Sequence, residues 1–148
     1  MEEFLSRHRK IGLDTSVFIF QIENNPKYVK LTHGIFEWLQ STKGRGVTST
    51  VTMLELLVQP YRDSDEGLVD TYYSLFSTYP HLEWANATLE IADSAAQLRS
   101  KFNLKTPDAI QAATALSFGA TGLISNDEVF RRVPDLETLI LDDLLKLD

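Results

Sequence analysis

Short apolar runs alternate along the chain with longer segments in which apolar residues recur every three or four positions. The short runs predict strands at residues 10–14, 46–49, 81–85, 121–125 and 137–141. The longer segments predict helices at residues 16–25, 26–42, 52–59, 63–79, 88–102 and 106–119. Because strand and helix alternate, we expect an α/β fold: a three-layer sandwich with a mostly parallel sheet of roughly five strands and helices on both faces.

The composition of the chain favours a single soluble domain without disulfides. No repeat, low-complexity tract or long linker interrupts the chain, so we expect residues 1–148 to form a single domain. The chain has no cysteine, which excludes disulfides and thiolate metal sites and favours a cytoplasmic location. No apolar run approaches the ~18 residues that would cross a bilayer, and the charged start is unlike a signal peptide. We therefore expect a soluble protein without a membrane partner.

Charge is unevenly distributed along the chain. The net charge is -7, which argues against binding nucleic acid through bulk electrostatics. Residues 1–50, however, carry seven Lys and Arg against five Asp and Glu, whereas residues 51–148 carry seven against sixteen. Basic pairs at Lys43 with Arg45 and at Arg131 with Arg132 are candidates for phosphate contacts. Ordinary solvated surface is the alternative interpretation of both pairs.

Four acidic residues fall where strands end or helices begin. Asp14 ends the first predicted strand, and Glu55 lies one turn into the helix after the second. Asp108 begins the alanine-rich helix, and Asp127 follows the strand at residues 121–125. The carboxyl ends of parallel strands meet at one edge of a sheet, which is where such folds bind ligands. We therefore expect the four acids to lie near one another.

Two interpretations of these acids compete. Asp is a good helix cap, and acids are stabilised at helix N-termini, so each acid alone fits a structural role. Capping, however, needs one acid per helix and not a cluster. Two carboxylates about 4 Å apart repel by roughly 4 kcal/mol at an effective dielectric constant near 20, so several together need a cation. Oxygen ligands favour Mg²⁺ or Mn²⁺.

Four segments, in this order, resemble the PIN domain family and most closely its small members of the VapC toxin type. They are residues 13–19, 48–57, 105–116 and 119–133. The resemblance implies a fold related to the ribonuclease H-like and FEN nuclease architectures. It places the family's acidic positions on Asp14, Glu55, Asp108 and Asp127. Ser16 and Asn126 match polar positions beside the site, and Ser125 stands where many members have threonine.

The resemblance also implies a function. Its members are metal-dependent endoribonucleases, so we expect Mg²⁺ or Mn²⁺ held by the four acids to activate a water against an RNA phosphodiester. Ser16, Ser125 and Asn126 would orient the ligands. A small antitoxin is the expected protein partner, and a homodimer is possible. The alternatives are a PIN-fold protein that binds RNA or a partner without cutting, and a phosphotransfer enzyme or receiver domain. The phosphotransfer enzyme fits less well because Asp14-Thr15-Ser16 lacks a D-x-D motif. The receiver domain fits less well because adjacent acids, such as Asp65-Glu66 and Asp142-Asp143, lie in surface-like runs.

Overall fold

The fold is built on a five-stranded sheet with the strand order β3-β2-β1-β4-β5. The computed structural model describes residues 1–41 and 44–146. The strands are β1 (Lys10–Leu13), β2 (Arg45–Ser49), β3 (Leu82–Ala85), β4 (Gly122–Ser125) and β5 (Glu137–Ile140). All four strand pairings within the described residues are parallel. The predicted α/β class with a mostly parallel sheet of five strands is therefore confirmed.

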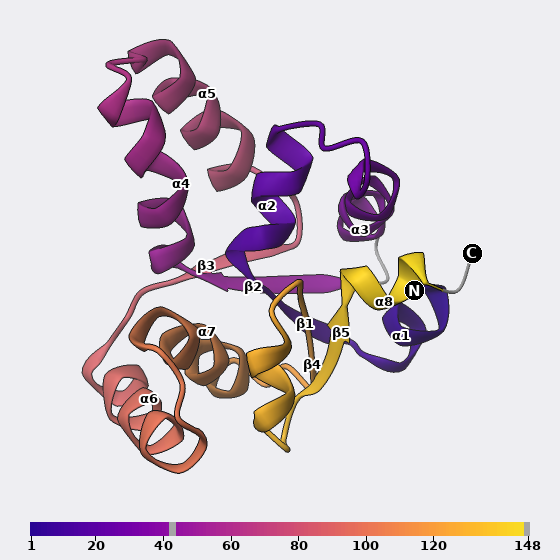
Figure 1. Cartoon of the computed structure of the whole chain (residues 1–148), viewed down its shortest axis with the longest axis vertical. Helices are drawn as coiled ribbons and strands as arrows, with labels where there is room; N and C mark the ends of the chain where they lie inside the picture. The colour runs from indigo at the N-terminus through magenta and orange to yellow at the C-terminus, as the bar shows by residue number, and fades with distance from the viewer. Residues whose placement is uncertain (42–43, 147–148) are drawn as a thin grey trace.

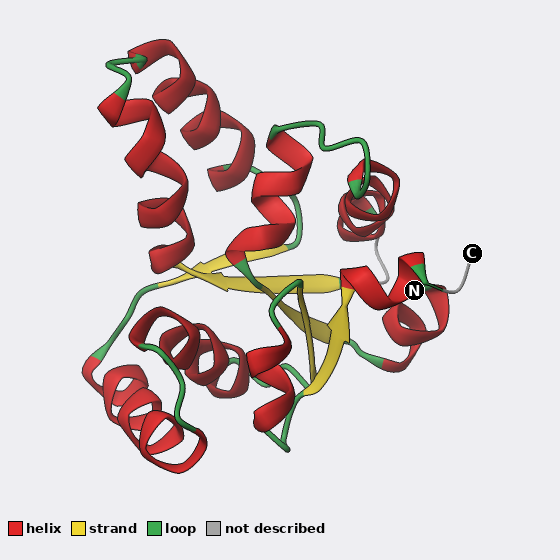
Figure 2. Ribbon diagram, in the orientation of Figure 1, coloured by secondary structure: helices red, strands yellow, loops and turns green. Residues whose placement is uncertain are grey.

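Helices cover both faces of the sheet (Figures 1 and 2). One side carries α2 (Thr15–Ile22), α3 (Val29–Gln40), α4 (Thr50–Arg62) and α5 (Glu66–Ser77). The other side carries α6 (Leu89–Phe102) and α7 (Thr106–Ser117). The remaining elements are α1 (Glu2–Arg7), the short 3-10 helix η1 (Glu128–Arg132) and α8 (Leu141–Leu145). Within the described ranges, no helix is long and apolar enough to cross a membrane.

Each face of the sheet has its own apolar core. On the side of α2 to α5, Phe18 packs edge-on against Phe36 and Phe76, with ring centroids 5.7 Å and 5.1 Å apart. On the other side the core is rich in small side chains, and Ala109, Ala112 and Ala115 of α7 are buried. These alanines bring the backbone of α7 close to the sheet. The helix that carries Asp108 is thereby fixed against the strand that precedes Asp14.

Several helix boundaries differ from the prediction by one to three residues, and the ends of α4 and α3 are two of them. Helix α4 continues through Pro60 to Arg62 rather than ending at residue 59. Pro60 donates no backbone hydrogen bond, but little of the helix follows it because it lies close to the C-terminal end. Asp63 N–H and Asp65 N–H close the helix end on the Gln59 and Pro60 carbonyls. Helix α3 ends at Gln40, and residue 42, its predicted end, lies outside the described residues.

Candidate functional site

The topology brings the four acids to one edge of the sheet. Asp14 follows β1 directly, and its N–H bonds the Ile124 carbonyl of β4 at 3.0 Å, which sets it beside the end of that strand. Asp127 begins η1 just after β4. Glu55 lies in the second turn of α4, which follows β2, and Asp108 lies in the first turn of α7. We call these residues the four-acid cluster.

Electrostatic coupling shows that the four carboxylates are near one another. Burial, followed by the negative charges of Asp127, Asp14 and Glu55 in that order, raises the pKa of Asp108 to about 6. Lys105 acts in the opposite direction but does not cancel them. Burial of its carboxylate also raises the pKa of Glu55, with a smaller contribution from Asp14. Burial and the neighbouring negative charges therefore both disfavour the ionised form of Asp108.

Two serine hydroxyls hold the Asp14 carboxylate. Ser16 Oγ donates to Asp14 Oδ2 at 2.9 Å, and Ser125 Oγ donates to the same oxygen at 2.7 Å. Each hydroxyl in turn accepts a backbone N–H from the loop after β4, Ser16 from Asn126 and Ser125 from Asp127. Among the hydrogen bonds of residues 1–41 and 44–146, Asp14 Oδ1 receives none. That oxygen is therefore the one available to a cation.

A network of buried polar side chains holds Glu55, and none of these side chains was predicted from the sequence as a site residue. Thr15 Oγ1 donates to Glu55 Oε1 at 2.8 Å and lies 3.2 Å from Thr52 Oγ1. Thr52 also contacts Thr48 and Gln111, and all four of these partner side chains are buried. Buried polar groups that satisfy one another hold a defined geometry. In the sequence these residues look like ordinary helix and strand positions, because only the fold brings them together.

The candidate phosphate contacts are not gathered at the four-acid cluster. Arg131 pairs with Asp143, and Arg132 donates to the carbonyls of Phe102 and Asn103. Arg45 begins β2 and so lies at the opposite, amino edge of the sheet. Lys43 lies outside the described residues. Lys105, which the sequence analysis did not select, is the cation that acts on Asp108.

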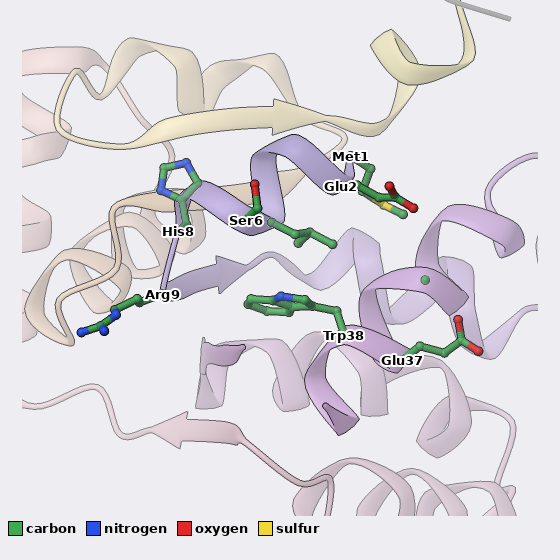
Figure 3. A pocket seen from close by; sticks show the side chains of 9 residues that line it. Met1, Glu2, Ser6, His8, Arg9, Glu37 and Trp38 are labelled. Atoms are coloured by element: carbon green, nitrogen blue, oxygen red, sulfur yellow. The ribbon is translucent and has the colours of Figure 1, made fainter. Parts of the chain in front are cut away.

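Histidines take no part in this cluster. His8 contacts Thr121 Oγ1 at 2.8 Å and Glu137 Oε2 at 3.0 Å, near the amino edge of the sheet. It lines a cavity of about 450 Å³ between α1 and α3, together with Arg9 and Trp38 (Figure 3). This cavity is larger than the groove of about 170 Å³ beside Glu55, yet its lining belongs to α1, α3 and the residues before β1, away from the four-acid cluster. The size of a cavity therefore does not identify the candidate site, because none of the four acids lines this one.

The donor set fits a divalent cation. It consists of carboxylates, and burial together with the acidic neighbours raises the pKa of Asp108 to about 6, so a cation would offset both the burial of the charge and the repulsion between the acids. Within residues 1–41 and 44–146, however, no three acidic or histidine side chains stand close enough to chelate one ion without moving. Binding by three of the acids would therefore require their side chains to move.

Comparison with known proteins agrees with this architecture. The PIN domain family model matches residues 11–136. Similar solved structures include a toxin-antitoxin complex from Klebsiella pneumoniae, with 22% identity and a TM-score of 0.62, covering 86% of this chain and 94% of that one. VapBC-1 from nontypeable Haemophilus influenzae has 19% identity and a TM-score of 0.67, covering 90% and 98%. DNA-bound VapBC from Salmonella typhimurium has 20% identity and a TM-score of 0.63, covering 90% and 98%.

At these identities the structural likeness establishes the fold. The search of curated proteins finds no match. The family assignment rests on the family match, which spans β1, β4 and all four residues of the four-acid cluster. The chain belongs to the PIN domain family.

Proposed function

We propose that the protein is a Mg²⁺- or Mn²⁺-dependent endoribonuclease whose site is the four-acid cluster. The observation that carries the proposal is the convergence of four carboxylates from the end of β1, α4, α7 and the loop after β4. Burial, together with the charges of the other three acids, raises the pKa of Asp108 to about 6. A structural role in helix capping does not require that convergence. A cluster of carboxylates can hold the cation that activates water for hydrolysis of a phosphodiester.

In this proposal each residue of the cluster has a distinct task. Asp14, Asp108 and Asp127 hold the cation, with Asp14 using the oxygen left free by its serine partners. The bound ion supplies a water of lowered pKa and neutralises charge on the phosphate. Glu55, fixed by Thr15, either completes the ligand set or orients the attacking water. The raised pKa of Glu55 suits a group that accepts a proton at the edge of the site.

A cleavage assay tests the proposal. The protein should cut some members of a panel of defined RNAs in Mg²⁺ or Mn²⁺ and none in excess chelator. Asp14→Asn and Asp108→Asn should lower turnover by roughly 10²-fold or more and change RNA binding less, because they remove ligands and not phosphate contacts.

The matched control is His33→Gln, which changes an exposed histidine paired only with Glu37 and should cut as the wild type does. Cutting that persists in chelator would contradict the metal mechanism. RNA binding without any cutting would favour the alternative of a non-catalytic PIN-fold protein.

We further propose that the protein is a toxin restrained by a small antitoxin. A groove of about 170 Å³ between α2, α4 and α5 reaches Glu55. Its lining is both apolar and acidic: Ile19, Ile22, Glu23, Glu55, Leu56, Gln59, Pro60, Asp63, Leu68 and Tyr72. A partner segment with apolar side chains and an arginine or lysine would match this lining and could place its cation among the acids. The likeness to toxin-antitoxin complexes supports the same partner class.

Expression in a bacterial host tests the toxin role. The wild type should arrest growth, whereas Asp108→Asn, expressed in soluble form at the same level, should not. A small protein encoded beside it should restore growth and bind the groove, and Ile22→Arg should weaken that binding because it places a cation in the apolar part of the lining. Equal growth of the wild type and Asp108→Asn would contradict the toxin role.

A further inference from the structure

A chain of hydrogen bonds leaves the four-acid cluster through Asn126. The Asn126 backbone N–H donates to Ser16 Oγ at 3.1 Å, and Ser16 donates to Asp14 Oδ2. Asn126 also lies between Ser125, the second donor to Asp14, and Asp127. The position of this one residue therefore affects two members of the cluster.

The Asn126 side chain contacts residues outside the cluster and not the acids themselves. Its Oδ1 accepts the Asp142 backbone N–H at 2.9 Å, at the start of α8. Its Nδ2 lies 3.3 Å from Tyr28 Oη and 3.4 Å from Asp142 Oδ2. The amide is thus held by Asp142 on its acceptor side and by Tyr28 and Asp142 on its donor side.

Tyr28 and Asp142 are themselves fixed. Tyr28 is 6% exposed, and its ring stacks on Phe20 with centroids 4.0 Å apart. Its hydroxyl donates to Asp142 Oδ1 at 2.8 Å. Lys27 Nζ donates to that same carboxylate oxygen at 2.7 Å and to Tyr28 Oη at 2.8 Å. The Lys27–Asp142 ion pair and the buried Tyr28 hydroxyl are hydrogen-bonded to one another, and together they restrict the position of the Asn126 amide.

We infer that Tyr28 and the Lys27–Asp142 pair are positioning residues, which fix the Asn126 loop and thereby aim Asp14 and Asp127 at the cation. This inference rests on the proposed metal site. Groups that orient ligands without touching the metal commonly change metal affinity or activity by about 10- to 100-fold when they are removed. The three residues come from the α2–α3 connection and from α8, outside the segments that supply the acids.

Tyr28→Phe tests the inference, because it keeps the ring stacked on Phe20 and removes only the hydroxyl. The matched control is Tyr79→Phe, which removes a hydroxyl that donates to the Phe36 carbonyl at 3.1 Å and accepts from Gln40 at 3.0 Å, far from the cluster. Calorimetric titration with Mn²⁺ should give a Kd about 10-fold weaker for Tyr28→Phe and unchanged for Tyr79→Phe. On RNA, Tyr28→Phe should lower kcat with little change in KM.

A double-mutant cycle separates positioning from general destabilisation. If Tyr28 acts through Asn126, then Tyr28→Phe should weaken Mn²⁺ binding no further once Asn126→Ala is present. Additive losses would overturn this path. Equal Mn²⁺ affinity in the wild type, Tyr28→Phe and Tyr79→Phe would overturn the inference while leaving the metal site intact. A wild-type protein that binds no Mn²⁺ would overturn the proposed function and the inference together.

Discussion

At the scale of single residues, capping and clustering turn out to coexist. The Asp127 carboxylate accepts the Val129 N–H at 2.9 Å and so caps η1, as the structural interpretation of the sequence expects. Asp14 occupies the N-cap position of α2 but caps no N–H with its side chain, which is held by Ser16 and Ser125 instead. In a parallel sheet, strand ends and helix starts occupy the same edge. The sequence could therefore place these acids but could not separate the two roles.

The raised pKa of Asp108 predicts that the stability of the metal-free protein depends on pH. This pKa is raised from 3.8 to about 6 in the folded state, so the native protein binds this proton more tightly than the unfolded chain does. The proton on Asp108 therefore stabilises the folded protein. This stabilisation is complete below the pKa of 3.8 that the carboxyl has in the unfolded chain, and it is lost as the pH rises through about 6. Asp108→Asn removes this dependence. Measured in chelator, the variant should gain stability relative to the wild type between pH 4 and pH 7.

Asp70→Asn, on the exposed side of α5, is the control and should show no such gain relative to the wild type. If the difference in unfolding free energy between the wild type and Asp108→Asn is the same at every pH, then Asp108 is not coupled to the other acids in solution.

At the scale of elements, the site depends on how closely α7 approaches β1. A side chain added at Gly12 would bring its Cβ to 2.8 Å from Ala115 Cβ, which is closer than such atoms pack. The small alanine side chains of α7 permit this close approach to β1. The sequence did not reveal which strand the helix meets, because the partner is a glycine without a periodic signal. The short α1 was also not predicted.

Gly12→Ala should therefore disturb both stability and metal binding. Overpacking at this contact should lower the free energy of unfolding by about 1–3 kcal/mol. It should also weaken Mn²⁺ binding, because α7 must shift and Asp108 moves relative to Asp14. Chemical denaturation and Mn²⁺ titration measure the two effects. The control is Gly67→Ala in α5, where the nearest atom to an added Cβ is Asp65 Oδ1 at 3.7 Å, and which should be neutral or slightly stabilising. Equal behaviour of the two variants would contradict this account of the packing.

At the scale of the whole molecule, the order of strands and helices was readable from the sequence because apolar runs and periodic segments alternate regularly. The surface was less readable. Arg131 and Arg132 look available in the sequence, but the fold engages one with Asp143 and the other with backbone carbonyls. No sequence pattern marks Tyr28 and Asp142 as neighbours of the site, because the two residues are 114 positions apart and only the fold brings them into contact.

The proposed function requires that Asp14, Asp108 and Asp127 bind one cation together. Thermal unfolding with and without Mn²⁺ tests this requirement most directly. Asn caps a helix about as well as Asp, so Asp→Asn at each position isolates the metal role. At a Mn²⁺ concentration 100 times the Kd, the wild type should gain about 2.7 kcal/mol, seen as a rise in Tm. Each of the three variants should lose most of that rise, and Asp70→Asn should keep it. An equal rise in the wild type and all three variants would contradict the shared metal site.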